Sequence, residues 1–165
     1  MPDQQLLALR EITGRLDNRA LAHWLFGGWA VDFYVGRMTR PHGDIDLAVW
    51  SHDADEIEAL ITRHGWKQAP APDDNGGTGY EQDSIRLELT YILEGASGEV
   101  LIAFRDGPAL WSASSFGNEV RELAGVSARV IPLEVLRRGK STPREDAKEA
   151  AIDQADFDAL SRLGK

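Results

Sequence analysis

The chain has 165 residues, no cysteine and a formal net charge of −9 at pH 7. This length is typical of one domain whose hydrophobic core is large enough to need no disulfide or structural metal ion for stability. The absence of cysteine excludes disulfides and thiol chemistry. The acidic balance opposes general binding of nucleic acid, and no apolar run approaches the roughly 18 residues of a membrane span.

Apolar spacing in the first part of the chain predicts two helices and one strand. Leucine and isoleucine recur at helical spacing from the start, and this first helix is expected to break near Asn18. Residues 21–26 form an apolar run that we expect to end in a strand. A second helix is predicted from Gly28 to about Val35, because Gly36 suits the left-handed residue that often follows a helix.

A third helix has both a start signal and a stop signal. Asp53 and Glu56 have the spacing of a capping box, and Gly65 is expected to end the helix. Residues 70–79 are rich in Pro, Asp and Gly, so they predict an exposed loop between strands. A plain connection is favoured there over a border of a substrate cleft.

Three later segments are expected to pair as antiparallel strands. They are residues 80–82, 85–93 and 99–104, with a turn at 95–98. Pro132 and residues 153–156 then predict helices that close the domain from about residue 132 onward. Because helices and strands alternate, the expected fold class is α/β (α+β), a mixed sheet flanked by helices in a single domain over residues 1–165.

Two pairs of residues in the first third of the chain indicate a nucleotide site. Gly27 and Gly28 follow the first expected strand, where paired glycines let backbone N–H groups approach a triphosphate as the next helix begins. Asp44 and Asp46 are two residues apart on an expected strand, so their side chains share one face. Two adjacent carboxylates repel each other unless a cation lies between them, and Mg²⁺ prefers such oxygen ligands.

A third carboxylate, Glu88, lies on the expected strand over residues 85–93. This segment alternates between an apolar face and a polar face that only Ile92 interrupts. The apolar face carries Leu87, Leu89, Tyr91 and Leu93, and the polar face carries Arg86, Glu88 and Thr90. If this strand neighbours the strand with the aspartates, Glu88 completes a site for two metal ions roughly 3.5 to 4 Å apart.

Arg40 and His42 flank the aspartates and have two possible roles each. An arginine here suits the oxygens of a triphosphate, but it is equally expected at the surface or paired with a neighbouring acid. His42 is a candidate for contact with phosphate or with an acceptor hydroxyl, although a single histidine in a turn is more often structural.

Residues 27–47 read GGWAVDFYVGRMTRPHGDIDL. This run resembles the signature of small antibiotic nucleotidyltransferases, the aminoglycoside 2''-adenylyltransferase and lincosamide nucleotidyltransferase group of the polymerase-beta-like superfamily. The resemblance implies a polymerase-beta-like core in which Gly27 and Gly28 open the nucleotide site, Asp44 and Asp46 bind magnesium, and a carboxylate on a later strand completes the triad. That carboxylate falls best on Glu88, where enzymes of the group carry aspartate.

The expected function is metal-dependent nucleotidyl transfer: AMP from ATP is moved to a hydroxyl of an aminoglycoside or lincosamide antibiotic, and pyrophosphate is released. The catalytic and metal-binding residues are predicted to be Asp44, Asp46 and Glu88, with Gly27, Gly28, Arg40 and His42 at the nucleotide. The predicted cofactor is Mg²⁺, as two ions. We expect a cytoplasmic resistance enzyme whose partners are a nucleoside triphosphate and a small-molecule acceptor, with neither nucleic acid nor membrane.

Two alternatives from other classes share part of this pattern. A toxin–antitoxin-type nucleotidyltransferase, which modifies a protein or RNA, would carry the same glycines and aspartates. A non-catalytic relative would keep the fold and only bind a ligand, but binding alone does not require a cluster of carboxylates.

Overall fold

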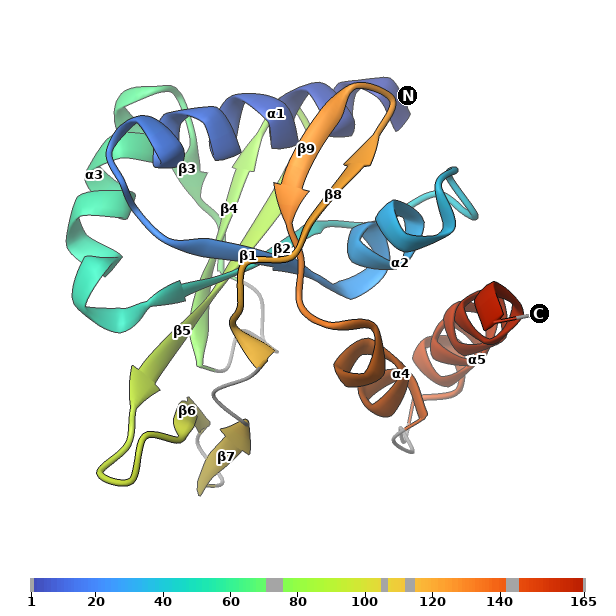
Figure 1. Cartoon of the computed structure of the whole chain (residues 1–165). Helices are drawn as coiled ribbons and strands as arrows, with labels where there is room; N and C mark the ends of the chain where they lie inside the picture. The colour runs from blue at the N-terminus through green and yellow to red at the C-terminus, as the bar shows by residue number, and fades with distance from the viewer. Residues whose placement is uncertain (1, 71–75, 105–106, 112–114, 142–145, 165) are drawn as a thin grey trace.

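A mixed β-sheet forms the centre of the computed structural model, which describes residues 2–70, 76–104, 107–111, 115–141 and 146–164 (Figure 1). The described residues contribute seven strands: β1 (His23–Phe26), β2 (Ile45–Trp50), β3 (Lys67–Gln68), β4 (Gly77–Gln82), β5 (Ile85–Glu94), β6 (Val100–Phe104) and β7 (Gly107–Trp111). The order is β1-β2-β5-β4-β3, and β6 pairs with both β5 and β7. Because β2 and β5 run parallel while their other neighbours are antiparallel, the predicted mixed sheet is confirmed.

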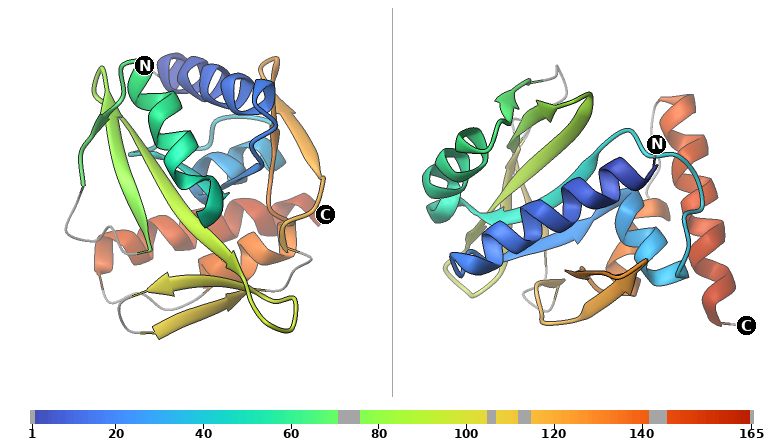
Figure 2. Two further views of the ribbon diagram at one scale, coloured as in Figure 1. Left: turned by 90° about the vertical axis from the view of Figure 1, so that its left-hand side faces the viewer. Right: turned by 90° about the horizontal axis from the view of Figure 1, so that it is seen from above.

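Helices flank the sheet, as predicted. The described helices are α1 (Pro2–Asn18), α2 (Gly27–Val35), α3 (Ala54–Arg63), α4 (Leu133–Ser141) and α5 (Ala147–Ser161), with short 3-10 turns η1 (Ser51–Asp53) and η3 (Arg162–Gly164). Helices α1 and α3 lie over one side of the sheet, whereas α4 and α5 lie away from them, beside α2 (Figures 1 and 2). None of the described helices has the length and apolar composition that crossing a bilayer requires.

The alternation of side chains in β2 and β5 divides the sheet into an apolar face and a polar face. Ile45 and Leu47 of β2 are fully buried, and so are Leu87 and Leu89 of β5. These four residues share one core with Leu9, Ile12 and Leu16 of α1. The intervening side chains, which include Asp46 and Glu88, therefore point to the opposite side of the sheet.

The predicted apolar face of β5 fails near its end. Ile92 is fully buried, whereas Leu93 is 40% exposed. At this end β5 leaves β4 and pairs with β6, where Ile92 lies opposite the buried Ile102. The change of partner reverses which side of the strand meets the core, so the simple alternation places Leu93 wrongly.

Helix α2 ends as its sequence predicts. Gly36 has the left-handed conformation with φ of 85°, and its N–H donates to Asp32 O at 2.8 Å. A glycine adopts this conformation without the steric cost that other residues carry. The chain therefore turns sharply out of α2 into residues 37–44, which lead to the aspartates.

Of two predicted helix starts, the one at Asp53 is confirmed, since Asp53 is the N-cap of α3, but its predicted capping box is absent; the one at residues 153–156 is wrong. The Asp53 side chain accepts no capping hydrogen bond, because residues Ser51–Asp53 already form η1 and run directly into α3. Residues 153–156 lie inside α5, which begins earlier with Asp146 as its N-cap; the Asp146 carboxylate accepts from Glu149 N at 2.9 Å. Because Asp146 caps the helix, α5 begins at Ala147, several residues before the predicted start.

The expected loop over residues 70–79 is only partly a loop. Residues 71–75 lie outside the described residues, but Gly77 to Gly79 belong to β4 and pair with β5. A Cβ atom built on Gly77 would meet the Leu89 carbonyl oxygen at 1.8 Å, so glycine is needed for this close strand pairing. Further along, the chain forms a separate hairpin of β8 (Val120–Leu123) and β9 (Val126–Arg129).

Candidate active site

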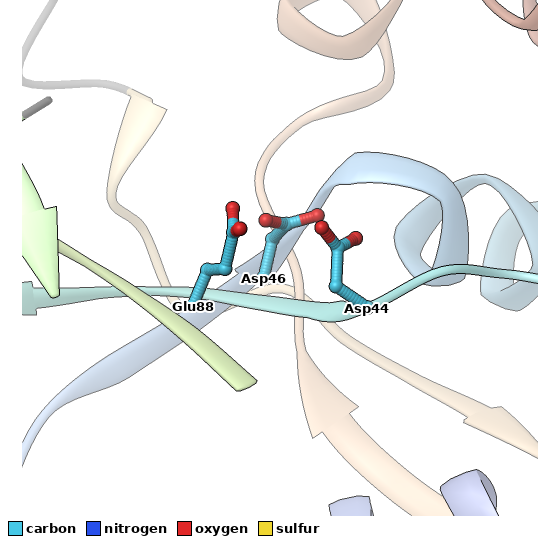
Figure 3. A group of neighbouring side chains, drawn as sticks. All are labelled: Asp44, Asp46 and Glu88. Carbon is cyan, nitrogen blue, oxygen red and sulfur yellow. The ribbon is translucent and has the colours of Figure 1, made fainter. Parts of the chain in front are cut away.

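Three carboxylates come together on the polar face of the sheet (Figure 3). Asp46 of β2 lies directly opposite Glu88 of β5 in the parallel register, and Asp44 immediately precedes β2. One oxygen from each carboxylate lies within 4.8 Å of the others. The strands are thus neighbours, as the prediction for Glu88 requires, although Asp44 lies just outside the strand on which it was expected.

The electrostatics of this cluster favour a bound cation. Burial is the largest cause that raises the pKa of Asp46 well above its ordinary value, and the charges of Asp44 and Glu88 raise it further. Lys140 opposes this shift only in part. The ionised form of Asp46 is therefore disfavoured in the absence of a cation, and the donors of the cluster are all oxygen, which fits a hard divalent cation such as Mg²⁺.

Glu88 has a neighbour on its own strand that the sequence also places on the polar face. Arg86 Nε donates to Glu88 Oε1 at 3.0 Å, and both side chains are partly buried. Arg86 also donates to the carbonyl oxygen of Ala69, the residue directly after β3. The arginine therefore fixes the carboxylate of Glu88 and ties its strand to a neighbouring connection.

Gly27 and Gly28 begin α2 beside the carboxylates. Gly27 has φ of +69°, and a Cβ atom there would lie 2.3 Å from Asp46 Oδ2. A Cβ atom on Gly28 would lie 2.5 Å from His42 Nδ1 and 2.6 Å from an Arg40 terminal nitrogen. Both glycines are needed for close approach of the helix start to the site, which is a reason beyond the access to phosphate that the sequence predicts.

Arg40 and His42 each pair with a buried acid. Arg40 Nε and Nη2 donate to the two oxygens of Asp156 at 2.9 Å each. His42 Nε2 lies 2.5 Å from Asp32 Oδ2, and the side chains of His42 and Asp32 are 2% and 0% exposed. For Arg40 the predicted alternative of pairing with an acid is therefore present, and the buried pair of His42 with Asp32 agrees with the structural alternative for that histidine.

A cavity of about 490 Å³ opens above the carboxylates. Gly27, Gly28 and Arg40 line it with Asp44, Asp46 and Glu88, whereas His42 lies behind Gly28 and does not. The far wall comes from segments that carry no recognisable motif. It includes Trp111 of β7, Val135 and Lys140 of α4, and Glu149, Ile152 and Asp153 of α5.

The sequence did not predict this far wall, because the residues that form it belong to no recognisable motif. Lys140 is one of several basic residues at the end of α4, and nothing in its neighbourhood singles it out. Glu149, Ile152 and Asp153 recur at helical spacing on α5, but their common face is visible only once the helix is known to begin at Ala147. The Asp153 and Asp156 carboxylates both lie near Lys140 Nζ, at 3.2 and 3.0 Å.

Comparison with known proteins supports the predicted resemblance. The model of the aminoglycoside-2''-adenylyltransferase family matches residues 8–137 of the chain. A 2''-aminoglycoside nucleotidyltransferase from Klebsiella pneumoniae is 38% identical over 65 residues, which are 39% of this chain and 37% of that relative. The aligned segment thus spans little more than a third of the relative's length.

Two solved structures have a similar fold. The lincosamide antibiotic adenylyltransferase LnuA, with lincomycin bound, has a TM-score of 0.74 at 18% identity over 94% of this chain and 95% of its own. ANT(2'')-Ia in complex with adenylyl-2''-tobramycin has a TM-score of 0.70 at 22% identity over 98% of this chain and 90% of its own. The predicted nucleotidyltransferase fold is therefore confirmed.

Proposed function

This chain belongs to the aminoglycoside-2''-adenylyltransferase family, and on that premise we propose that it transfers AMP from ATP to a hydroxyl group of an aminoglycoside- or lincosamide-type antibiotic. The observation that carries this proposal is the set of three carboxylates, Asp44, Asp46 and Glu88, at the base of the cavity. In the reaction, the acceptor oxygen forms a bond to the α-phosphorus, the bond from that phosphorus to the β-phosphate oxygen breaks, and pyrophosphate leaves.

Asp44, Asp46 and Glu88 would hold divalent cations, which we propose to be two Mg²⁺ ions. When bound, these ions supply charge neutralisation for the phosphate oxygens. The raised pKa of Asp46 supports this assignment, because burial and the neighbouring charges of Asp44 and Glu88 disfavour its ionised form, and a bound cation would offset both. A site of this kind needs no covalent intermediate, since positioning and charge stabilisation carry most of phosphoryl transfer.

Two groups of this chain would act on the nucleotide and on the acceptor. The backbone N–H groups at Gly27 and Gly28 lie at the start of α2, where the helix dipole favours phosphate oxygens, and Arg40 adds a positive charge beside them. Glu88 has two candidate roles: it shares the cation of the aspartates, or it accepts the proton of the acceptor hydroxyl. Its hydrogen bond from Arg86 suits both roles, because it keeps the carboxylate in place.

The acceptor would occupy the wall built by β7, α4 and α5. Trp111, Val135 and Ile152 offer apolar surface for a sugar ring or an alkyl group, and the acids Glu149 and Asp153 lie on the same wall. The net charge of −9 attracts cationic acceptors such as aminoglycosides. We propose that residues 1–165 act as one nucleotidyltransferase domain, which α4 and α5 close, and that it works in the cytoplasm, where ATP is supplied.

The test is pyrophosphate release from ATP in the presence of Mg²⁺ with a panel of aminoglycosides and lincosamides. We expect release that depends on one class of acceptor and that is lost in Asp44→Ala and Asp46→Asn. Asp158→Asn is the matched control, because this acid is exposed on α5 and should leave release unchanged. Folded protein that releases no pyrophosphate with any acceptor would refute the proposal, and transfer of radiolabel from ATP to a protein or RNA would favour a macromolecular target.

A further inference from the structure

A buried carboxylate outside the metal-binding cluster joins the two cations on the cavity wall. The side chain of Asp156, on α5, is only 1% exposed. It accepts two hydrogen bonds from Arg40, both of 2.9 Å, and lies 3.0 Å from Lys140 Nζ. Arg40 and Lys140 both line the cavity that contains the carboxylate cluster, so Asp156 lies directly behind the positive part of its wall.

Asp156 remains ionised because of these two partners. Burial by itself would raise the pKa of its carboxyl group, but the hydrogen bonds and charges of Arg40 and Lys140 hold that pKa below its ordinary value. A buried carboxylate without such partners would carry a large desolvation penalty. The three side chains therefore hold one another in place.

The contact fixes the direction of the Arg40 guanidinium group. Two of its five N–H donors bind Asp156, and a third donates to the Pro41 carbonyl oxygen at 3.1 Å. Its Nη2 atom lies close to Gly28, where a Cβ atom would be only 2.6 Å away. The guanidinium is thus oriented at the start of α2, beside the backbone N–H groups that suit a phosphate.

Lys140 is held by a similar arrangement on the opposite side of Asp156. Its Nζ atom lies near the carboxylates of both Asp153 and Asp156, which are three residues apart on α5. A lysine side chain has many rotamers, and two acceptors at 3.0 and 3.2 Å select among them. Arg40 and Lys140 are consequently presented as a pair, although they come from distant parts of the chain.

We propose that Asp156 is a positioning residue of the nucleotide site, which holds Arg40 and Lys140 ready for the phosphate oxygens of a nucleoside triphosphate. This inference rests on the proposed function. The other charged groups on the cavity wall include five acids, so the two cations mark the region in which a polyphosphate is favoured. Asp156 and Lys140 both lie beyond residues 8–137, the part of the chain that matches the family model.

The decisive variant is Asp156→Asn, with binding of α,β-methylene ATP and Mg²⁺ measured by calorimetry in the absence of acceptor. We expect the dissociation constant to rise about tenfold or more, because charge-assisted contacts that orient both cations are lost. In turnover, KM for ATP should rise while KM for the acceptor stays within about twofold. A merely structural role would lower stability without this selectivity for the nucleotide.

Three controls separate positioning from other effects. Asp158→Asn removes a charge from the exposed side of the same helix and should leave nucleotide binding unchanged. In an Arg40→Gln background, Asp156→Asn should add less to the dissociation constant than it does in the wild type, because part of its effect passes through Arg40. If Asp156→Asn does not fold, Asp156→Glu keeps the charge but displaces it, and should weaken nucleotide binding selectively.

The outcomes distinguish this inference from the proposed function. Equal nucleotide affinity in the wild type and in a folded Asp156 variant would overturn the inference and leave the proposed function standing. A wild-type protein that binds no nucleotide would overturn the proposed function, and the inference with it. Weaker nucleotide binding with unchanged acceptor affinity supports both.

Discussion

At the scale of single residues, the cluster combines a functional requirement with a cost in stability. Asp46 lies between Asp44 and Glu88, and its burial together with their charges disfavours its ionised form. Groups that a binding site keeps in such an unfavourable state are often those whose removal stabilises a protein while it loses activity. Asp46 is the position in this chain where that conflict is expected to be largest.

We therefore expect Asp46→Asn to stabilise the metal-free protein by on the order of 1 kcal/mol while it abolishes turnover. Asparagine has the same shape but removes the charge that Asp44 and Glu88 oppose. Thermal unfolding with and without Mg²⁺ provides the measurement. Added Mg²⁺ should raise the melting temperature of the wild type and have little effect on the variant. A variant that is less stable than the metal-free wild type would contradict this account.

His23 makes folding sensitive to pH at a position away from the cavity. Burial is the main cause that lowers the pKa of this histidine below its ordinary value of 6.5. The hydrogen bond between Nδ1 and Leu21 O and the charge of Asp17 raise the pKa, but by less than burial lowers it. Above pH 6.5 the ring is neutral in both the folded and the unfolded chain. Below that pH the unfolded chain takes up a proton more readily, so stability falls by up to about 1.4 kcal/mol per pH unit until the folded pKa is reached.

The measurement is the midpoint of urea unfolding between about pH 7.5 and about pH 5.5. The wild-type midpoint should fall across this range more steeply than that of His23→Asn, which has no titrating ring at this position. Parallel profiles for the two proteins would show that His23 does not contribute.

At the scale of elements, α2 and the segment after it act as one unit. Asp32, fully buried on α2, accepts from Thr39 N at 3.1 Å, from Thr39 Oγ1 at 2.6 Å and from His42 Nε2 at 2.5 Å. Gln5 of α1 adds a second connection, because it donates to the His42 carbonyl oxygen and accepts from the Trp29 ring nitrogen. These bonds hold residues 37–44, and so Asp44, against the start of α2.

Asp32→Asn is expected to destabilise the fold by about 2 to 3 kcal/mol, since a buried acceptor of charge-assisted hydrogen bonds is replaced by a neutral amide. Turnover should fall as well, because Asp44 follows the segment that loses its anchor. Thr39→Val is the milder comparison, with a loss of about 1 kcal/mol for one side-chain hydrogen bond. Urea unfolding of the wild type, Asp32→Asn and Thr39→Val measures their relative stabilities. An Asp32→Asn protein as stable as the wild type would refute this prediction.

The elements also show what the sequence alone can predict. The period of two in β2 and β5 was sufficient to place Asp46 and Glu88 on one face, and Gly36 was sufficient to end α2. Two features depend on tertiary contacts instead: the exposed Leu93, where β5 changes partner, and the strand at Gly77, which needs β5 beside it. The far wall of the cavity was not predictable, because Lys140 and Asp156 meet through helix packing and carry no local signal.

At the scale of the whole molecule, the acidic charge distribution bears on the choice of acceptor. The chain carries a net charge of −9, and the cavity wall includes Glu149 and Asp153. Long-range attraction of this kind raises the encounter rate of cationic ligands and is screened by salt. An acceptor with several ammonium groups should therefore respond to ionic strength more strongly than one with a single ammonium group.

We expect kcat/KM for an aminoglycoside to fall severalfold between about 50 and about 300 mM NaCl, and kcat/KM for a lincosamide to fall much less. Steady-state kinetics at a fixed concentration of ATP and Mg²⁺ measures both, and the ratio of the two responses cancels the effect of salt on the nucleotide. Equal responses would show that the net charge has no part in acceptor capture.

The ion pair between Arg40 and Asp156 joins residues that are 116 positions apart in the sequence. Synthesis on the ribosome produces Arg40, Asp44, Asp46 and Glu88 long before it reaches α5, so the carboxylate cluster can be translated in full before the acid that orients Arg40 exists. A gene with a premature stop codon before Asp156 would keep every residue of the recognisable signature and still encode an incomplete site. If the proposed function holds, a survey of genomes for such resistance genes should check that the reading frame extends through α5.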